Sequence, residues 1–441
     1  MSNPAEQIDI LRVRITAERF REDGFLDVQE MVTEINMYSH MSMPFLTGNM
    51  VMFDDLNVFG DAQLQGTERV EFSYRNPAII EPITRRFVIT DISSTKTNDQ
   101  TAQLVMGLVE DIGYHNNVHR FSKSYTGDGE TILNKIVNDG LGLEIQNDGF
   151  PDTASIQGAF RYIVPYQTTF EACAVVLQKM TTEAGLPFFL YKGFNNDKVT
   201  LTNLETILRK DPGNFETPFQ YSQSNAASND QINLIYNVNT YDEDVNEATM
   251  QLIMNGGLKS RVQIMDITSG DYTEIDVNML TVINELVRRG ITRSPIPLID
   301  EAFVPNPADG RTGDTIMTDT YDPHYSSVVA AETYPLSALG FGQERRLYQH
   351  SLKAVRKAML MHLYKNTYTI TGPGAILTTG STDYDVGKQI RVDIQDNTLI
   401  NSKIDERRSG TFIITAQRLR FSIDEKLHTY SMDISRITND G

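Results

Sequence analysis

The chain of 441 residues carries 39 Lys and Arg against 58 Asp and Glu, a formal net charge of -19, and 40% of its residues are hydrophobic. A surface this acidic repels polyanions, which argues against tight binding to nucleic acid, and a chain of this length exceeds a single core, so we expect two to four domains. No uninterrupted apolar run reaches the ~18 residues of a membrane span, and residues 1–7 lack the basic and apolar parts of a signal peptide, so we expect neither a membrane-spanning segment nor secretion by that route.

Residues 28–116 are expected to form an antiparallel barrel or sandwich. Period-2 alternation and compact apolar runs recur there between Gly, Asn and Asp turn residues, as expected of five or more strands. These strands are predicted at residues 31–37, 49–53, 70–75, 87–92 and 103–112.

At Asp128 the spacing of apolar residues becomes helical. Asp128 is expected to cap a helix that ends at Gly140, because Asp favours the N-cap and Gly the C-terminus. Thr168 or Thr169 is expected to cap a second helix that ends at Gly185. Cys173 is the only cysteine, which excludes an intrachain disulfide; with its apolar neighbours it is expected in the core rather than as a nucleophile, in a protein made in a reducing cytoplasm.

The segments that follow combine short strands, a linker and a long loop. A hairpin over residues 187–202 makes the middle region α+β. Residues 220–231 are rich in Ser, Asn and Gln and are expected to be a linker, followed by a strand at 232–240. Residues 261–289 repeat the hairpin-plus-helix pattern, and residues 295–334 are the longest weakly structured segment, a length that is usually functional or an extended arm.

The last hundred residues return from helix to strand. Helical periodicity covers residues 340–366, and clean alternation follows at residues 389–394. Residues 409–434 give the clearest pattern, two period-2 strands joined by a tight polar turn, with Arg418 and Arg420 on one face of the first strand. Such a hairpin completes a sheet or barrel and has no feature of an active site, which favours an assembly part.

Three phrases in this order resemble a known family. They are GDGETILNKIV at 127–137, IVPYQTTFEA at 163–172 and TNLETIL at 202–208, placed after a β-rich region and before a hairpin that looks like the last strands of a tube barrel. The chain resembles the baseplate hub protein of contractile-tailed, T-even-like bacteriophages, and is similar to the hub module of type VI secretion spike proteins.

The resemblance implies an α+β fold, mainly β, with two tube-type antiparallel β-barrels and an inserted peripheral α+β domain. On that basis residues 1–118 form the first barrel, residues 119–222 with 256–330 form the peripheral domain, and residues 223–255 with 331–441 form the second barrel. A trimer of such chains would make a pseudo-sixfold ring, because each chain contributes two barrels.

The resemblance also implies a structural role in a contractile injection system. The chain is expected in the tail baseplate of the virion, assembled in the host cytoplasm, where it links the central spike to the tail tube or its initiator and contacts wedge proteins. DNA would pass during genome ejection without tight binding. Two alternatives stay open: a tail-associated hydrolase of cell wall or polysaccharide, and a tube-initiating tail protein with a single barrel.

The sequence offers little for catalysis, so we expect no enzyme. His115 and His119 have helical metal-ligand spacing, but the two asparagines between them favour a loop, as turn chemistry does for His324. The acidic run 242–244 lacks the glycine of a calcium loop, and the glycines at 371–374 and 340–342 lack the spacing of a phosphate loop. We predict no catalytic, cofactor-binding or metal-binding residue and no cofactor.

Overall fold

The computed structural model describes residues 4–20, 24–55, 57–77, 81–96, 101–149, 160–221, 235–243, 257, 259–265, 272–292, 296–297, 324–326, 352, 355–364, 367–395, 404–405 and 408–439. The predicted linker 220–231 lies outside them except for residues 220–221, and of the predicted loop 295–334 only residues 296–297 and 324–326 are described. None of the helices in this part of the chain has both the length and the apolar character needed to cross a bilayer.

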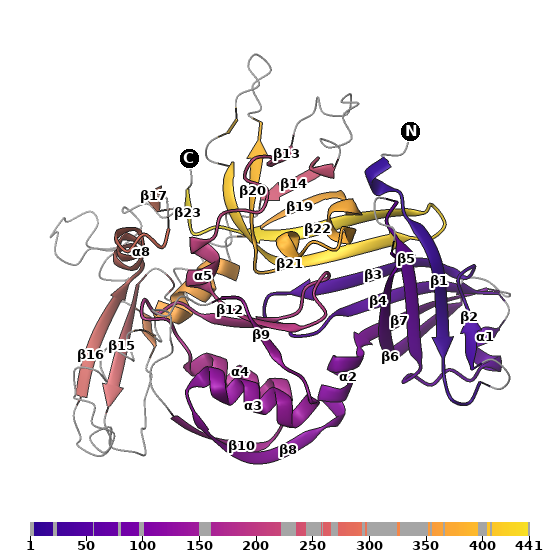
Figure 1. Cartoon of the computed structure of the whole chain (residues 1–441), viewed down its shortest axis with the longest axis horizontal. Coiled ribbons are helices and arrows are strands. Elements are labelled where there is room, and N and C mark those ends of the chain that lie inside the picture. The colour runs from indigo at the N-terminus through magenta and orange to yellow at the C-terminus, as the bar shows by residue number, and fades with distance from the viewer. Residues whose placement is uncertain are drawn as a thin grey trace.

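A large sheet of 13 strands dominates the chain, which confirms the prediction of a mainly β, α+β fold (Figure 1). Its main path is antiparallel throughout. The order is β14 (Thr240–Glu243), β19 (Thr367–Pro373), β22 (Leu427–Ser435), β21 (Gly410–Ser422), β3 (Val32–His40), β4 (Thr47–Asp54), β7 (Ala102–Glu110), β6 (Ile83–Lys96), β5 (Arg69–Arg75), β1 (Asp9–Thr16) and β2 (Phe25–Asp27). Beside this path, β13 (Phe219–Tyr221) pairs with β20 (Gln389–Ile394), which pairs with β21.

Strand β21 joins the strands of the N-terminal part to those of the C-terminal part. One of its edges pairs with β22, so the predicted C-terminal hairpin is confirmed. Its other edge pairs first with β20 over residues 410–413 and then with β3 over residues 416–422, where Arg418 lies opposite Tyr38. The long strand therefore makes one continuous sheet out of two sets of strands that lie far apart in the sequence (Figure 1).

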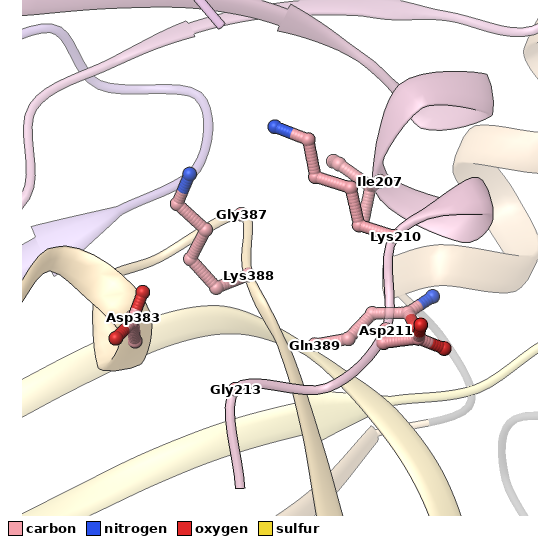
Figure 2. A pocket seen from close by; sticks show the side chains of 8 residues that line it. All are labelled: Ile207, Lys210, Asp211, Gly213, Asp383, Gly387, Lys388 and Gln389. Carbon is pink, nitrogen blue, oxygen red and sulfur yellow. The ribbon is translucent and has the colours of Figure 1, made fainter. Parts of the chain in front are cut away.

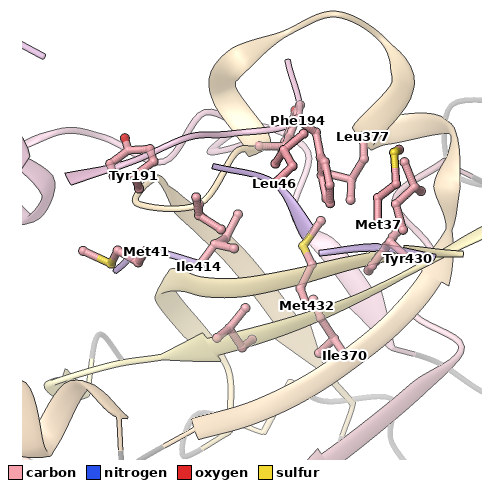
Figure 3. Packing of buried hydrophobic residues seen from close by; sticks show 14 of the residues in the cluster. Met37, Met41, Leu46, Tyr191, Phe194, Ile370, Leu377, Ile414, Tyr430 and Met432 are labelled. Atoms are coloured by element: carbon pink, nitrogen blue, oxygen red, sulfur yellow. The ribbon is translucent and has the colours of Figure 1, made fainter. Parts of the chain in front are cut away.

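One large hydrophobic cluster lies on the inner side of this sheet. Alternating residues of β3 and β22, such as Met37 and Met432, are completely buried in it. Figure 3 shows these side chains packed with residues of other elements, among them Phe194 of the middle region and Leu377 of the short 3-10 helix Gly374–Thr378. Because both strand sets bury their apolar face in the same cluster, neither half has a core to itself.

A second, smaller cluster holds the middle of the chain together. Its buried side chains come from two helices and the strands around them. These elements are α3 (Gly129–Leu141), α4 (Thr169–Lys179), β8 (Arg120–Gly127), β10 (Phe160–Thr168), β11 (Phe188–Tyr191) and β12 (Val199–Asn203), with β9 (Ile145–Asn147) pairing to β12. The packing of both helices against the hairpin confirms that this region is α+β with its own core.

The two predicted helix starts are confirmed, and both predicted ends are wrong. The Asp128 carboxylate accepts from the Thr131 N–H, and Thr168 forms a capping box with Glu171. Helix α3 runs through Gly140 to Leu141 because Gly142 takes the left-handed C-cap conformation, at φ 65°. Helix α4 ends at Lys179, where the backbone becomes extended, so the predicted end at Gly185 lies in the following turn.

The predicted hairpin and helix of residues 261–289 form β15 (Lys259–Met265), β16 (Tyr272–Asn278) and α8 (Met279–Arg288). The helix buries Met279, Ile283 and Leu286 in the large cluster, together with side chains from helical residues 355–364. His324, predicted in a turn, lies in strand β18 (His324–Ser326), which pairs with β15 and leaves no turn there. The short elements are α1 (Val58–Asp61), α2 (Asp111–Val118), α5 (Leu204–Arg209), β17 (Ile296–Pro297) and β23 (Thr438–Asn439), with further 3-10 turns at Pro4–Glu6 and Thr382–Tyr384.

Candidate functional site

The sheet has an open face on the side opposite the large cluster. Side chains alternate along a strand, so the residues between the buried ones of β22, β21, β3, β4 and β7 point away from the core. Cross-strand register places them in rows, for example Ser431 opposite Arg418 and Arg418 opposite Tyr38. We define the open face as Thr429, Ser431, Asp433, Arg418, Arg420, Glu34, Asn36, Tyr38, Asn49, Val51, Phe53 and Val105.

Glu34 contacts both arginines of this face. Its carboxylate accepts from Nε of Arg420 at 2.8 Å, with Nη2 of the same guanidinium at 2.6 Å, and lies 3.5 Å from Nη2 of Arg418. Burial alone would raise the pKa of Glu34, but hydrogen bonds from Asn36 and Arg420 and the charges of both arginines hold this pKa below its usual value. Glu34 is therefore ionised at neutral pH and shared by two cations.

Asn36 holds this group in place. It is 2% exposed, and its amide donates to Glu34 and to Asn49 Oδ1, both at 2.7 Å. Its carbonyl oxygen accepts from Nε of Arg418 at 2.9 Å. Both the NH2 group and the oxygen of this buried amide are hydrogen-bonded, which fixes the side chains around it. The open face is therefore polar and rigid across the junction of β3 and β21.

The main path of the large sheet ends on two strands that have one neighbour each. Within the described part of the chain, β14 pairs only with β19, and β2 pairs only with β1. The outer edges of such strands carry N–H and C=O groups that can pair with another chain.

The loop of residues 192–197 ties the middle region to the N-terminal strands. Lys192 and Glu110 form a buried ion pair at 2.5 Å, with 4% and 12% of their side chains exposed. Ser39 donates its hydroxyl to the Lys192 carbonyl at 2.7 Å. Arg85 donates to the Phe194 carbonyl and to Asp197 at 2.9 Å. These contacts fix the loop against β3, β6 and the end of β7.

Asp385 ties the same loop to the C-terminal strands. Its carboxylate accepts from the Asn195 N–H at 3.2 Å and is 1% exposed. The approach needs a glycine at position 193, because a Cβ there would lie 2.3 Å from Oδ2 of Asp385. Burial raises the pKa of Asp385 to about 7, although the Asn195 N–H, Lys388 and Arg85 act in the opposite direction. This carboxyl therefore titrates near neutral pH.

A cavity of about 170 Å³ lies beside this junction (Figure 2). The ammonium groups of Lys210 and Lys388 point to the same side of it, and each lies 2.9 Å from a carboxylate oxygen of Asp148. Burial would raise the pKa of Asp148, but hydrogen bonds from Lys388 and Lys210 lower it. Both lysines already share a carboxylate, so they serve to hold residues 145–148 against β20.

One hollow brings together the residue types of a hydrolase. It has a volume of about 430 Å³ and is lined by His40, Ser42, Tyr364 and Asp433, among others. Ser42 Oγ lies 2.7 Å from Nδ1 of His40, and the ring stacks on Tyr364. The Asp433 carboxylate accepts from Thr369 at 2.8 Å instead of orienting the imidazole. A Ser–His pair two residues apart, on a strand end, is accounted for by turn geometry.

The histidines, acidic residues and glycines considered as possible metal or phosphate sites from the sequence lie apart from one another. His115 is inside α2, so the expected loop is helical, and His119 follows as the C-cap. Glu243 of the acidic run lies in β14 and pairs with Arg408 at 2.9 Å; residue 244 and the glycines at 340–342 lie outside the described residues. The glycines at 372 and 374 end β19 and begin a 3-10 helix. No cluster of three metal-ligating side chains occurs in the described ranges.

The alternation in the sequence predicts Arg418 and Arg420 on one face but does not indicate their partners. Glu34 and Asn36 lie 386 and 382 residues away from the arginines that they contact. No local pattern could identify this pairing, because strand register across such a distance is set by the whole sheet.

Two solved structures share the fold at comparable length. The tail protein from Neisseria meningitidis MC58 aligns with a TM-score of 0.50 and 11% identity over 98% of this chain and 97% of its own. The 43 kDa tail protein of prophage MuSo2 from Shewanella oneidensis aligns with a TM-score of 0.51 and 10% identity over 96% of this chain and 98% of its own.

A type VI secretion component of E. coli, c3393, aligns over 98% of this chain and 77% of its own at 8% identity, with a TM-score of 0.42. No protein-family model and no curated protein sequence matches the chain. Identities near 10% show a common fold and nothing finer. The chain thus has the fold of phage tail proteins, as the resemblance in its sequence predicts.

Proposed function

We propose that the chain is the hub subunit of a contractile phage tail baseplate, a structural part that forms a homotrimeric, pseudo-sixfold ring. The observation that carries this proposal is the pairing of β21 with β22 on one edge and with β3 on the other. Two strand sets are thereby fused side by side in one subunit, and three such subunits present six sets. The outer edges of β14 and β2 would pair between subunits and close the ring.

The domain division expected from the sequence is part of this proposal. Residues 1–118 and residues 223–255 with 331–441 are the two tube domains, and residues 119–222 with 256–330 are the peripheral domain. The separate cluster around α3 and α4 supports a peripheral unit. The shared cluster beneath the large sheet supports tube domains that act as one body.

The ring would sit in the tail baseplate of the virion and connect the central spike to the tail tube or its initiator, with wedge proteins around it. The open face would line the passage for DNA during genome ejection. Its mixture of hydroxyl, amide and paired charged groups supports passage without tight binding. The chain would be assembled in the host cytoplasm and would have no enzymatic task.

Native mass spectrometry of the purified chain tests the proposal, with negative-stain micrographs as a second measurement. We expect the mass of three chains and rings of sixfold appearance. A stable monomer at micromolar concentration, or a ring of six whole chains, would contradict it. Clearing of cell wall in a zymogram, abolished by Ser42→Ala in the His40 hollow, would instead support a hydrolase.

A further inference from the structure

The open face is electrically neutral, although the whole chain carries a net charge of -19. As defined above it holds two arginines, Arg418 and Arg420, and two carboxylates, Glu34 and Asp433. The excess negative charge of the chain is therefore not concentrated on this face. A surface with arginines at its centre binds phosphate unless something occupies their donors.

Glu34 and Asn36 occupy those donors. Arg420 directs both Nε and Nη2 at one oxygen of Glu34, at 2.8 and 2.6 Å. Arg418 directs Nε at Asn36 Oδ1, at 2.9 Å, and Nη2 toward the other oxygen of Glu34, at 3.5 Å. The Nε–Nη2 edge is one of the two forks that a guanidinium offers to a phosphate, and on both arginines this edge faces the protein.

We propose that Glu34 masks Arg418 and Arg420, so that the open face does not retain the DNA that passes it. This inference rests on the proposed function, because it takes the open face to line the passage. The arginines stabilise the junction, since they bridge β21 to β3 across the ladder that joins the two strand sets along the main path. The Glu34 carboxylate offsets the positive charge of both guanidinium groups, so the junction can contain arginines without attracting the phosphates of DNA.

The chain contains a matched control for this masking. Glu71 of β5 also pairs with two arginines, Arg12 at 3.0 Å and Arg86 at 3.5 Å. Its side chain is 24% exposed, the same as that of Glu34. It lies on β5, three strands beyond β4 in the sheet order. Glu71 is on the same side of the sheet as the open face, but outside the residues that define this face. Glu71→Gln therefore releases an equal number of arginines at a place that the proposal does not assign to DNA.

The test compares binding of a short fluorescein-labelled DNA duplex to assembled wild-type, Glu34→Gln and Glu71→Gln protein by fluorescence anisotropy. We expect Glu34→Gln to bind the duplex with an affinity that falls about tenfold between ~50 and ~200 mM salt, as two phosphate contacts imply. Wild type and Glu71→Gln should show no such binding. Adding Arg418→Gln and Arg420→Gln to Glu34→Gln should abolish the gain.

Equal binding by Glu34→Gln and Glu71→Gln, or no gain in Glu34→Gln, would overturn the masking role. Native mass spectrometry of the same samples separates this result from failure of the proposed function, which would show as absence of wild-type rings. If Glu34→Gln fails to assemble, Glu34→Ala replaces it, because this variant also removes the carboxylate that contacts both guanidinium groups. Unchanged DNA binding by assembled Glu34→Ala would then overturn the proposal.

Discussion

Nδ1 of His428 donates a hydrogen bond to the backbone carbonyl of Glu6 at 2.9 Å, which joins two residues 422 positions apart. The ring is 1% exposed, stacks on Phe421, and has Thr378 Oγ1 at 3.1 Å from Nε2. Next to it, the Ile8 N–H donates to the Lys426 carbonyl at 3.0 Å. The 3-10 turn Pro4–Glu6 is therefore anchored on the C-terminal hairpin.

The stability of the protein should fall on acidification below pH ~6.5 through His428 and His362. Burial lowers the pKa of each to about 4, despite hydrogen bonds to backbone carbonyls. The unfolded chain then binds these protons first, so stability is complete above the usual histidine pKa and is lost as the pH falls toward 4, by up to about 3 kcal/mol per residue. Urea unfolding of His428→Gln between pH 4 and 7 should show a flatter pH dependence than wild type; an equal slope would contradict this.

Asp385→Asn should stabilise the protein at pH 8 and change little at pH 4. The pKa of Asp385 is raised to about 7, so its stabilising contribution is present below the usual carboxyl pKa and is lost as the pH rises through 7. An asparagine oxygen can still accept from the Asn195 N–H. Thermal unfolding at both pH values measures the difference, and the exposed Asp383→Asn is the control. A destabilised Asp385→Asn at pH 8 would show that the ionised form is the one the fold needs.

Val176→Asp should open the small cluster and leave the large sheet folded. Val176 is completely buried beside Cys173, whose pKa is raised by burial so that the thiol stays neutral. Burying an unpaired carboxylate costs several kcal/mol, so Cys173 should become reactive to iodoacetamide under native conditions. Leu177→Asp, at a partly exposed position next to it, should have a smaller effect. Loss of hydrogen-exchange protection in β3 and β21 as well would mean that the two clusters unfold together.

Deleting residues 409–441 should prevent folding of the subunit and not merely its assembly. The deletion removes both β21 and β22. Loss of β21 would expose the edges of β3 and β20, and loss of β22 would expose the edge of β19. Expression should give insoluble protein. A soluble, folded monomer from the truncated chain would show that the two strand sets are stable without their junction.

Local rules predicted the parts of this fold that depend on neighbouring residues. The caps at Asp128 and Thr168 satisfy backbone N–H groups within three residues, so their sequence signature is complete. The alternation in residues 409–434 likewise reports a strand buried on one face. The predicted end of α3 at Gly140 was wrong because this glycine serves helix packing: a Cβ there would lie 2.1 Å from Oγ1 of Thr169. Gly142 takes the positive φ of the C-cap instead.

The junctions could not be predicted, because their partners are far apart in sequence. Asp385 and Asn195 meet across 190 residues, and nothing near either one distinguishes it from an ordinary loop residue. His115 was placed in a loop on the strength of two asparagines, but α2 tolerates them because Asn116 accepts from the Phe170 N–H and so caps the start of α4 from outside. Tertiary contacts of this kind override local propensity.

The pairing of β3 with β21 cannot form until almost the whole chain has been synthesised. The strand ending at His40 leaves the ribosome long before its partner, which begins at Gly410. At about 5–20 residues per second the wait is roughly 20 to 75 seconds. During that time the nascent chain presents an unpaired β edge with a finished neighbour, β4, on its other side. Translation speed, or a holding chaperone that covers this edge, would then decide how much of the product reaches a subunit instead of an aggregate.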